Sequence, residues 1–133
     1  TLHQQKIYAY REWQRVGVQV HEDETVDIQA SGEWLYTPGD YHGPEGHPRY
    51  PAPDFYPMAG VPGGILIGKI GETGTPFIVG NGTTVSAYEW QARDGEQTGG
   101  FLYLRINDDI LSDNKGAVVV AVTVNKIVDE YRD

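Results

Sequence analysis

Five side chains of the carboxylate and carboxamide type gather in one short segment, Asn107-Asp-Asp-Ile-Leu-Ser-Asp-Asn-Lys-Gly116. Three aspartates and two asparagines lie there within eight residues. Oxygen atoms at this density suit a hard cation, because calcium takes about six to eight oxygen ligands at about 2.3–2.6 Å. We expect Asp108, Asp113 and Asn114 to converge if the segment folds back on itself. The segment lacks the EF-hand register, and a polar hairpin loop is the alternative, since Asp, Asn and Gly are also turn residues.

Other reactive side chains form weaker patterns. The serines do not lie in a Gly-x-Ser-x-Gly elbow. The 19 acidic residues always supply some pair of carboxylates, but glycoside hydrolysis needs a deep cleft around that pair. Zinc is also disfavoured, because the histidines lack the spacing of a zinc motif. These are His3, His21, His42 and His47. We therefore expect a binding protein rather than an enzyme.

Aromatic residues near polar segments favour carbohydrate as a ligand. A sugar has an apolar C–H face and a hydroxyl edge, so it needs a flat aromatic surface together with hydrogen-bonding groups. The candidate aromatic residues are Tyr36, Tyr41, Tyr50 and Tyr56. For any single tyrosine, packing of a loop onto the protein is the simpler role.

Length and charge limit the fold and the partners. The chain has 133 residues, enough for one ordinary domain, and no cysteine. Its net charge of −9 argues against nucleic acid and anionic membranes, since both attract basic surfaces. The longest apolar runs are far shorter than the roughly 20 residues that span a bilayer. We expect a single domain that neither binds nucleic acid nor inserts into a membrane.

The apolar residues recur with a period of two, which predicts strands. The segments are Val16–Val20, Val26–Ala30, Ile65–Ile67, Leu102–Ile106 and Val118–Val124. In the last segment the intervening Val119 and Ala121 are apolar too, so this strand is expected to be central and covered on both faces. About seven to nine strands in one small domain predict an all-β fold, an antiparallel β-sandwich or barrel.

Turn signals separate these strands. The charged segment His21–Glu24 predicts a turn, and Asn81-Gly82 predicts a type I′ hairpin between flanking strands. Seven of the eight prolines lie between Pro38 and Pro62, which predicts one long ordered binding loop and no strand. The ends, about residues 1–5 and 126–133, are expected to be flexible tails or cut edges of a larger chain.

Five segments in fixed order carry a resemblance to a known family. They are Ala30-Ser-Gly-Glu-Trp-Leu-Tyr-Thr-Pro38, Gly43-Pro-Glu-Gly46, Leu66-Ile-Gly-Lys-Ile-Gly71, Gly100-Phe-Leu-Tyr-Leu-Arg-Ile-Asn-Asp108 and Asp113-Asn-Lys-Gly116. With the valine strand that follows, they resemble the calcium-dependent galactophilic bacterial lectins of the LecA type, over about Val18 to Val124. The resemblance implies a single galactose-binding-like, jelly-roll-type β-sandwich with one calcium ion at a loop end, to which two ring hydroxyls of the sugar bind directly.

The resemblance also implies a set of metal ligands. Tyr36 would give a backbone carbonyl, Asp108 a carboxylate and Asn114 a side-chain oxygen. Asp113 stands where the family has asparagine and would add a negative charge. One more backbone carbonyl is expected from the loop, at Ile110 or Leu111, and we favour Leu111.

The sugar-contacting residues depart further from the family. A His-Pro dipeptide followed by Gln contacts the sugar there. His47-Pro48 matches that dipeptide only with a shift in register, Tyr50-Pro51 occupies the unshifted register, and no glutamine follows either. The residues expected to contact sugar are Tyr36, His47, Tyr50, Asp108 and Asp113.

The sequence thus predicts a calcium-dependent carbohydrate-binding module or lectin for galactose-like sugars. The alternative is a structural accessory β-sandwich of a larger enzyme that binds no sugar itself. An extracellular or periplasmic location is favoured for a glycan binder. The sequence does not decide between a homo-oligomer and association with a parent enzyme.

Overall fold

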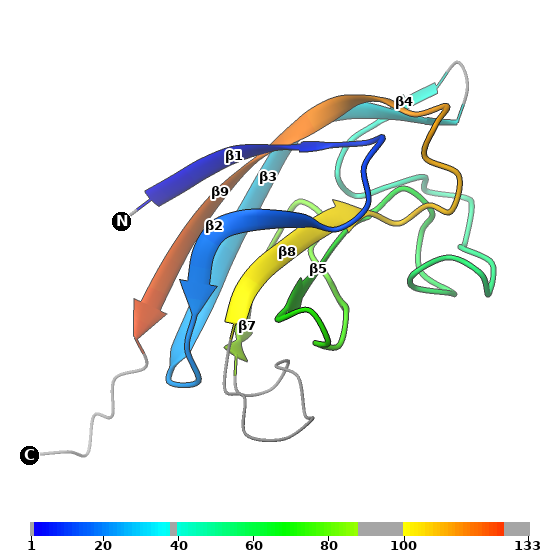
Figure 1. The fold of residues 1–133 in the computed structure, drawn as a ribbon. Coiled ribbons are helices and arrows are strands. Elements are labelled where there is room, and N and C mark those ends of the chain that lie inside the picture. Colours follow the sequence, from blue (N-terminus) through cyan, green and yellow to red (C-terminus); the bar gives the residue numbers. More distant parts are fainter. Residues whose placement is uncertain (1, 38–39, 88–99, 127–133) are drawn as a thin grey trace, which may run out of the picture.

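The protein is a sandwich of two antiparallel sheets, seen in a computed structural model that describes residues 2–37, 40–87 and 100–126 (Figure 1). One sheet has the strand order β1-β9-β3-β4, with β7 also paired to β3, and the other has the order β2-β8-β5-β6. The strands are β1 (Leu2–Tyr8), β2 (Gln14–Val20), β3 (Glu24–Thr37), β4 (Asp40–His42), β5 (Leu66–Ile70), β6 (Phe77–Ile78), β7 (Gly82–Ser86), β8 (Gly100–Ile106) and β9 (Lys115–Lys126). The predicted all-β sandwich is confirmed.

The core lies between the two sheets and is built from alternate residues of each strand. Leu102, Leu104 and Ile106 of β8 face Val118 and Val120 of β9, and all five are fully buried. Because successive side chains of a strand point to opposite faces, the period of two in the sequence becomes one buried face per sheet. This burial is the main favourable contribution to folding.

Strand β9 is central, between β1 and β3, but only one of its faces is buried. Val118, Val120 and Val122 point into the core, whereas Val119 on the opposite face is 41% exposed. The expectation that this strand is covered on both faces is therefore wrong. Its sheet packs against the second sheet on one side (Figure 1), and Val119 lies on the other side.

The Asn81-Gly82 pair does not form the predicted type I′ hairpin. The strand before it, β6, pairs with β5 in one sheet, and the strand after it, β7, pairs with β3 in the other. The Gly82 N–H donates to the Val79 carbonyl (3.1 Å), but the positive φ lies at Gly80 (57°). The chain crosses between the layers here, because each of the two short strands extends a different sheet.

Two further expectations about chain segments are corrected. Residues 2–5, expected as a tail, belong to β1, which pairs with β9 from Leu2 opposite Thr123 to Tyr8 opposite Ala117. The proline-rich segment, expected to contain no strand, begins with the short strand β4, paired with the end of β3. Residues 127–133 of the expected C-terminal tail lie outside the described residues, and Lys126 ends β9.

The proline-rich segment is an ordered loop that folds back on itself through backbone hydrogen bonds. His47 N–H donates to the Gly63 carbonyl (2.8 Å), Gly63 N–H to Tyr50 (2.8 Å) and Ala52 N–H to Val61 (2.7 Å). The fully buried Trp34 of β3 joins the loop to the sheet, because its Nε1 donates to the Gly64 carbonyl (3.1 Å). The loop therefore holds a fixed position at one end of the sandwich.

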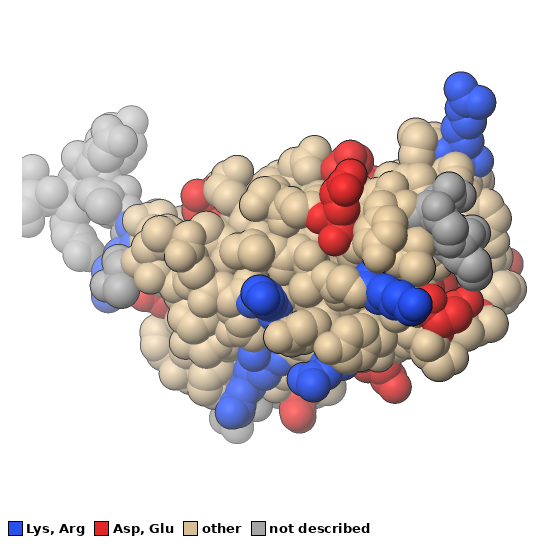
Figure 2. Space-filling view, turned by 90° about the horizontal axis from the view of Figure 1, so that it is seen from above, with Lys and Arg blue, Asp and Glu red and all other residues tan. Residues whose placement is uncertain are grey.

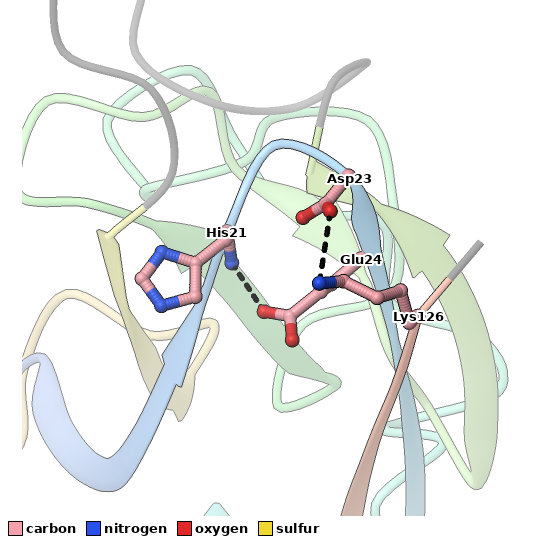
Figure 3. Close-up of polar contacts among 4 residues, drawn as sticks. All are labelled: His21, Asp23, Glu24 and Lys126. Atoms are coloured by element: carbon pink, nitrogen blue, oxygen red, sulfur yellow. Dashed lines mark hydrogen bonds and ion pairs between the residues drawn. The ribbon is translucent and has the colours of Figure 1, made fainter.

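The opposite end is closed by the predicted charged turn between β2 and β3. Glu24 Oε1 accepts a hydrogen bond from the His21 N–H (2.7 Å), and Asp23 pairs with Lys126 of β9 at 3.3 Å (Figure 3). Both partners of this ion pair are largely exposed, so it contributes little to stability. These contacts hold the turn in place. This end of the sandwich lies far from the proline-rich loop in Figure 1.

The surface seen from above in Figure 2 is mostly uncharged, and its acidic and basic side chains are scattered singly. The net charge of −9 is therefore not gathered into one patch on this face. Within the described ranges, we find no helix with the length and apolarity that crossing a membrane requires.

We predict that the same substitution at two neighbouring valines of β9 changes the stability by very different amounts. Val120→Thr buries a hydroxyl in the core and should lower the free energy of unfolding by about 1–3 kcal/mol. Val119→Thr, on the exposed face, should change it by less than about 0.5 kcal/mol. Urea unfolding followed by tryptophan fluorescence measures both. Equal losses would mean that both faces of β9 are covered.

Candidate site at the loop end of the sandwich

The Asp- and Asn-rich segment joins the two sheets. It follows β8 of one sheet and precedes β9 of the other, so it is a crossing between the sheets and not the hairpin considered above. It lies at the same end of the sandwich as the proline-rich loop (Figure 1). Two loops that are distant in the sequence are thereby brought together.

Asp108 and Asn114 form a buried polar pair within this crossing. Each is 4% exposed, and the Asn114 Nδ2 donates to Asp108 Oδ2 (2.8 Å). The same Nδ2 donates to the Ala9 carbonyl (2.9 Å), and the Asp109 N–H donates to Asp108 Oδ1 (2.8 Å). These bonds fix the carboxylate and the amide relative to the connection between β1 and β2.

One oxygen of this pair has no partner. The Asn114 Oδ1 is buried and accepts no hydrogen bond from the residues that the structure describes. The two acceptors of Nδ2 set the amide orientation, because turning it over would point Oδ1 at two other oxygens. A buried acceptor without a partner costs about 1–3 kcal/mol. A cation beside Asn114 Oδ1 would remove that cost, so these residues fit a hard metal ion.

Burial also disfavours the ionised form of the Asp108 carboxyl. Burial raises its pKa above the ordinary value, and the hydrogen bonds from Asn114 and from the Asp109 N–H act in the opposite direction. The guanidinium of Arg105 does not reach the carboxylate but holds the backbone, with Nη2 donating to the Asp108 carbonyl (2.7 Å). The carboxylate therefore keeps acceptor capacity for an added positive charge.

No three His, Cys, Asp or Glu side chains within the described ranges lie together as a metal site. An ion bound here would need amide and backbone oxygens as well as carboxylates, which is common for calcium. His3 and His21 lie at the far end of the sandwich, and the His42 and His47 rings pack at 4.6 Å.

Beside the Asp108–Asn114 pair lies an open hollow of about 380 Å³, which we call the first hollow. The proline-rich loop gives one wall, β3 the floor and the Asp-rich segment the other wall. It is lined by Tyr36, His47, Tyr50, Tyr56, Asp108, Asp109, Ile110 and Asp113. Ligand pockets are typically about 300–1,000 Å³, so this volume suits one small ligand.

Tyr36 is placed by its contacts on both sides. Its hydroxyl shares a hydrogen bond with that of Tyr56 (2.7 Å), and its ring lies against Gly63 and Gly64, where an added Cβ would collide with it. Burial raises the pKa of Tyr36 to about 12, so the hydroxyl stays neutral at physiological pH. The site therefore offers neutral phenol groups next to aspartates.

Tyr36 also lies at an irregularity of β3. Leu35 is paired with Tyr41 and Thr37 with Asp40, so Tyr36 is the extra residue of a bulge. The register with β9 ends at Leu35. The extra residue of a bulge has no partner residue in the ladder, so Tyr36 is paired neither with β4 nor with β9.

All five residues expected to contact sugar, Tyr36, His47, Tyr50, Asp108 and Asp113, line the first hollow. Of the remaining expected metal ligands, Asn114 lies buried beside Asp108, but the Leu111 side chain turns toward the core and a second hollow. Ile110, its alternative, lines the first hollow and is exposed. Tyr41, considered as a sugar contact, lies on β4 away from the hollow and is 55% exposed.

Two residues that hold the loops of the site could not be identified from the sequence. Asn107 is fully buried; its Nδ2 donates to the Met58 carbonyl (2.9 Å) and its Oδ1 accepts from the Met58 N–H (2.9 Å). Arg105 is 7% exposed and binds two backbone carbonyls of the crossing. Both residues hold the loops in place. Their spacing in the sequence gives no sign of it, because their partners are distant or are backbone groups.

Comparisons with known proteins bear on the fold. No protein-family model and no curated protein matches the sequence significantly. Among solved structures the chain is similar to the N-terminal domain of EclA, described as a PllA-like lectin, with a TM-score of 0.64 and 23% identity. The match covers 92% of this chain and 96% of that one. It confirms the sandwich, in a form that a lectin domain also has.

We predict that Asn107 fixes the proline-rich loop. Asn107→Ala leaves the backbone groups of Met58 without partners and should lower the free energy of unfolding by about 2–3 kcal/mol. Tryptic cleavage at Arg49, exposed in the same loop, should become faster. The control is Asn81→Ala, at an exposed position, which should change neither measurement. Unchanged cleavage at Arg49 in Asn107→Ala would contradict this role.

Proposed function

We propose that this chain is a calcium-dependent carbohydrate-binding domain, a lectin-like module that recognises galactose-like sugars. The observation that carries the proposal is the buried Asn114 Oδ1, without a partner, next to the Asp108 carboxylate and the first hollow. A cation would satisfy the buried Asn114 Oδ1 and offset the charge of Asp108, and the open hollow beside them can receive a ligand. The lectin description of the similar solved domain supports the same reading.

The proposed calcium ligands are the Asp108 carboxylate, the Asn114 Oδ1, the Asp113 carboxylate and the Tyr36 carbonyl. The bulge at Tyr36 supports the last of these, because Tyr36 has no paired residue in the registers of β3 with β4 and β9. A further carbonyl comes from Leu111 or Ile110, and we retain Leu111. Two carboxylates with neutral oxygens make a hard-ligand set that suits calcium.

The sugar would occupy the first hollow. Bound calcium would offer coordination positions to two adjacent hydroxyls, whose stereochemistry the geometry then selects. Asp108 and Asp113 would accept hydrogen bonds from those hydroxyls, and their charge strengthens such bonds. Tyr36, His47 and Tyr50 would contact the ring. The Tyr36 and Tyr50 rings lie 6.2 Å apart, which gives the apolar C–H face of a sugar an aromatic wall.

The first hollow supports binding rather than catalysis. It is shallow and open, so little area would be buried and the affinity for one sugar should be weak, roughly 10⁻³–10⁻⁵ M. A glycan-binding role favours an extracellular or periplasmic location.

Titration calorimetry with galactose tests the proposed function. In millimolar calcium, galactose should bind in the affinity range given above, and excess EDTA should abolish the heat. Glucose, which differs in the stereochemistry of one hydroxyl, is the matched control and should bind more weakly. Binding that survives complete removal of calcium would contradict the proposal. Calcium binding without response to any monosaccharide would favour the structural accessory domain.

We predict that two adjacent aspartates differ in their effect on calcium. In the wild type, calcium at 100 times its dissociation constant should add about 2.7 kcal/mol of stability. Asp108→Ala should lose this gain, because it removes the buried carboxylate ligand. Asp109→Ala, at an exposed position outside the proposed ligand set, should keep most of it. Urea unfolding of each variant with calcium and with EDTA measures the gain, and an equal gain in both variants would contradict the ligand assignment.

A further inference from the structure

A second hollow, of about 450 Å³, adjoins the first. The two share Tyr56, Asp108 and Asp109 as a common boundary. The second hollow lies between the β1–β2 connection and the proline-rich loop, and its further lining is Glu12, Trp13, Phe55, Pro57, Arg105 and Leu111. We infer that this second hollow takes the next sugar residue of a neutral oligosaccharide whose terminal residue occupies the first. The inference rests on the proposed function.

Phe55 is the first argument for a sugar in the second hollow. It is 69% exposed, the largest exposed fraction among the exposed large hydrophobic side chains of the described residues. Its ring meets that of Tyr56 edge to face, with centroids 5.5 Å apart, so the aromatic surface continues from the first hollow into the second. A flat aromatic surface at the edge of a polar hollow suits the C–H face of a sugar ring.

Trp13 forms the opposite wall rather than a second stacking surface. Lys69 Nζ lies 4.6 Å from the centre of its ring, and Arg105 Cζ lies 5.8 Å from it. These cations already occupy the π-system of Trp13. Phe55 therefore remains as the surface on which a ring would stack.

The polar groups of the second hollow suit hydroxyls. The Arg105 side chain is 7% exposed and fixed by bonds from Nε to the Ile106 carbonyl (2.9 Å) and from Nη2 to the Asp108 carbonyl (2.7 Å). These use two of the five guanidinium donors. Glu12 is exposed at the rim and supplies acceptors. A hydroxyl needs a donor and an acceptor together, and this pair offers both.

The charge of the lining favours a neutral sugar residue over an acidic one. Among the described residues that line this hollow, Arg105 is the one basic residue, against the carboxylates of Glu12, Asp108 and Asp109. If calcium offsets the charge of Asp108, two carboxylates remain. Those of Glu12 and Asp109 still outnumber the one guanidinium in the lining. A carboxylated or sulfated sugar at this position would meet a net negative surface.

The test compares the affinities of a monosaccharide and of longer sugars by calorimetry in millimolar calcium. The probes are methyl galactoside, a panel of neutral galactose-terminated disaccharides of different linkage, and a panel member with a carboxylated second residue. At least one neutral disaccharide should bind the wild type about three- to tenfold more tightly than methyl galactoside. The carboxylated sugar should show no such gain.

Phe55→Ala should remove the gain for the disaccharide and leave the affinity for methyl galactoside within about twofold. Glu12→Ala should reduce the gain in the same selective way. The matched control is Tyr41→Ala, an exposed aromatic residue that lines neither hollow, and it should leave both affinities unchanged.

The inference is overturned if no disaccharide exceeds methyl galactoside, or if Phe55→Ala weakens both ligands equally or neither. Each of these results is compatible with the proposed function. Failure of every monosaccharide to bind, in contrast, contradicts the proposed function itself, and the second hollow then loses its assignment with it.

Discussion

The hydrogen bond between Asn114 Nδ2 and Asp108 Oδ2 organises the loop end of the sandwich. It joins the residue that leaves one sheet to the residue that enters the other, and the same Nδ2 ties both to the Ala9 carbonyl. Burying a carboxylate is costly unless it is paired, and these bonds compensate only in part, since burial still raises the pKa of Asp108. The remaining cost, together with the unpartnered Asn114 Oδ1, is what a bound cation would relieve.

Rigid support from the interior makes this arrangement suitable for recognition. Trp34 and Asn107 attach the proline-rich loop to the two sheets through its backbone, and Arg105 holds the carbonyls of the crossing. Loops fixed in this way lose less conformational entropy when a ligand binds, which favours affinity in a shallow site. The same supports explain why the aromatic residues of the loop stand beside the aspartates.

Much of the fold was predictable, because the alternation of apolar residues in strands such as Leu102–Ile106 records which face is buried. The gathering of Asp108, Asp113 and the loop tyrosines at one hollow also agrees with the sequence. Pairing between strands was less predictable. Asn81-Gly82 has the composition of a hairpin turn, yet the strands on its two sides join different sheets. Only the packing of the two layers decides that choice.

The outer face of β9 shows a further limit on what can be predicted from the sequence. Val119 and Ala121 have the same chemistry as buried residues, and a sequence does not state what lies above a strand. Residues 2–5 look polar enough for a tail, yet their backbone completes the ladder of β9. Arg105 and Asn107 act through backbone groups, which no pattern of side chains records.

The central claim, that Asp108 and Asn114 hold calcium, is tested most directly by diffraction from crystals grown in calcium. An anomalous difference map at long wavelength locates the ion without assumptions about its ligands. The account predicts a peak about 2.3–2.6 Å from both the Asn114 Oδ1 and the Asp108 carboxylate, with the Tyr36 carbonyl in the same shell. A map at millimolar calcium with no peak there, and with Asn114 Oδ1 bonded to water instead, would contradict it.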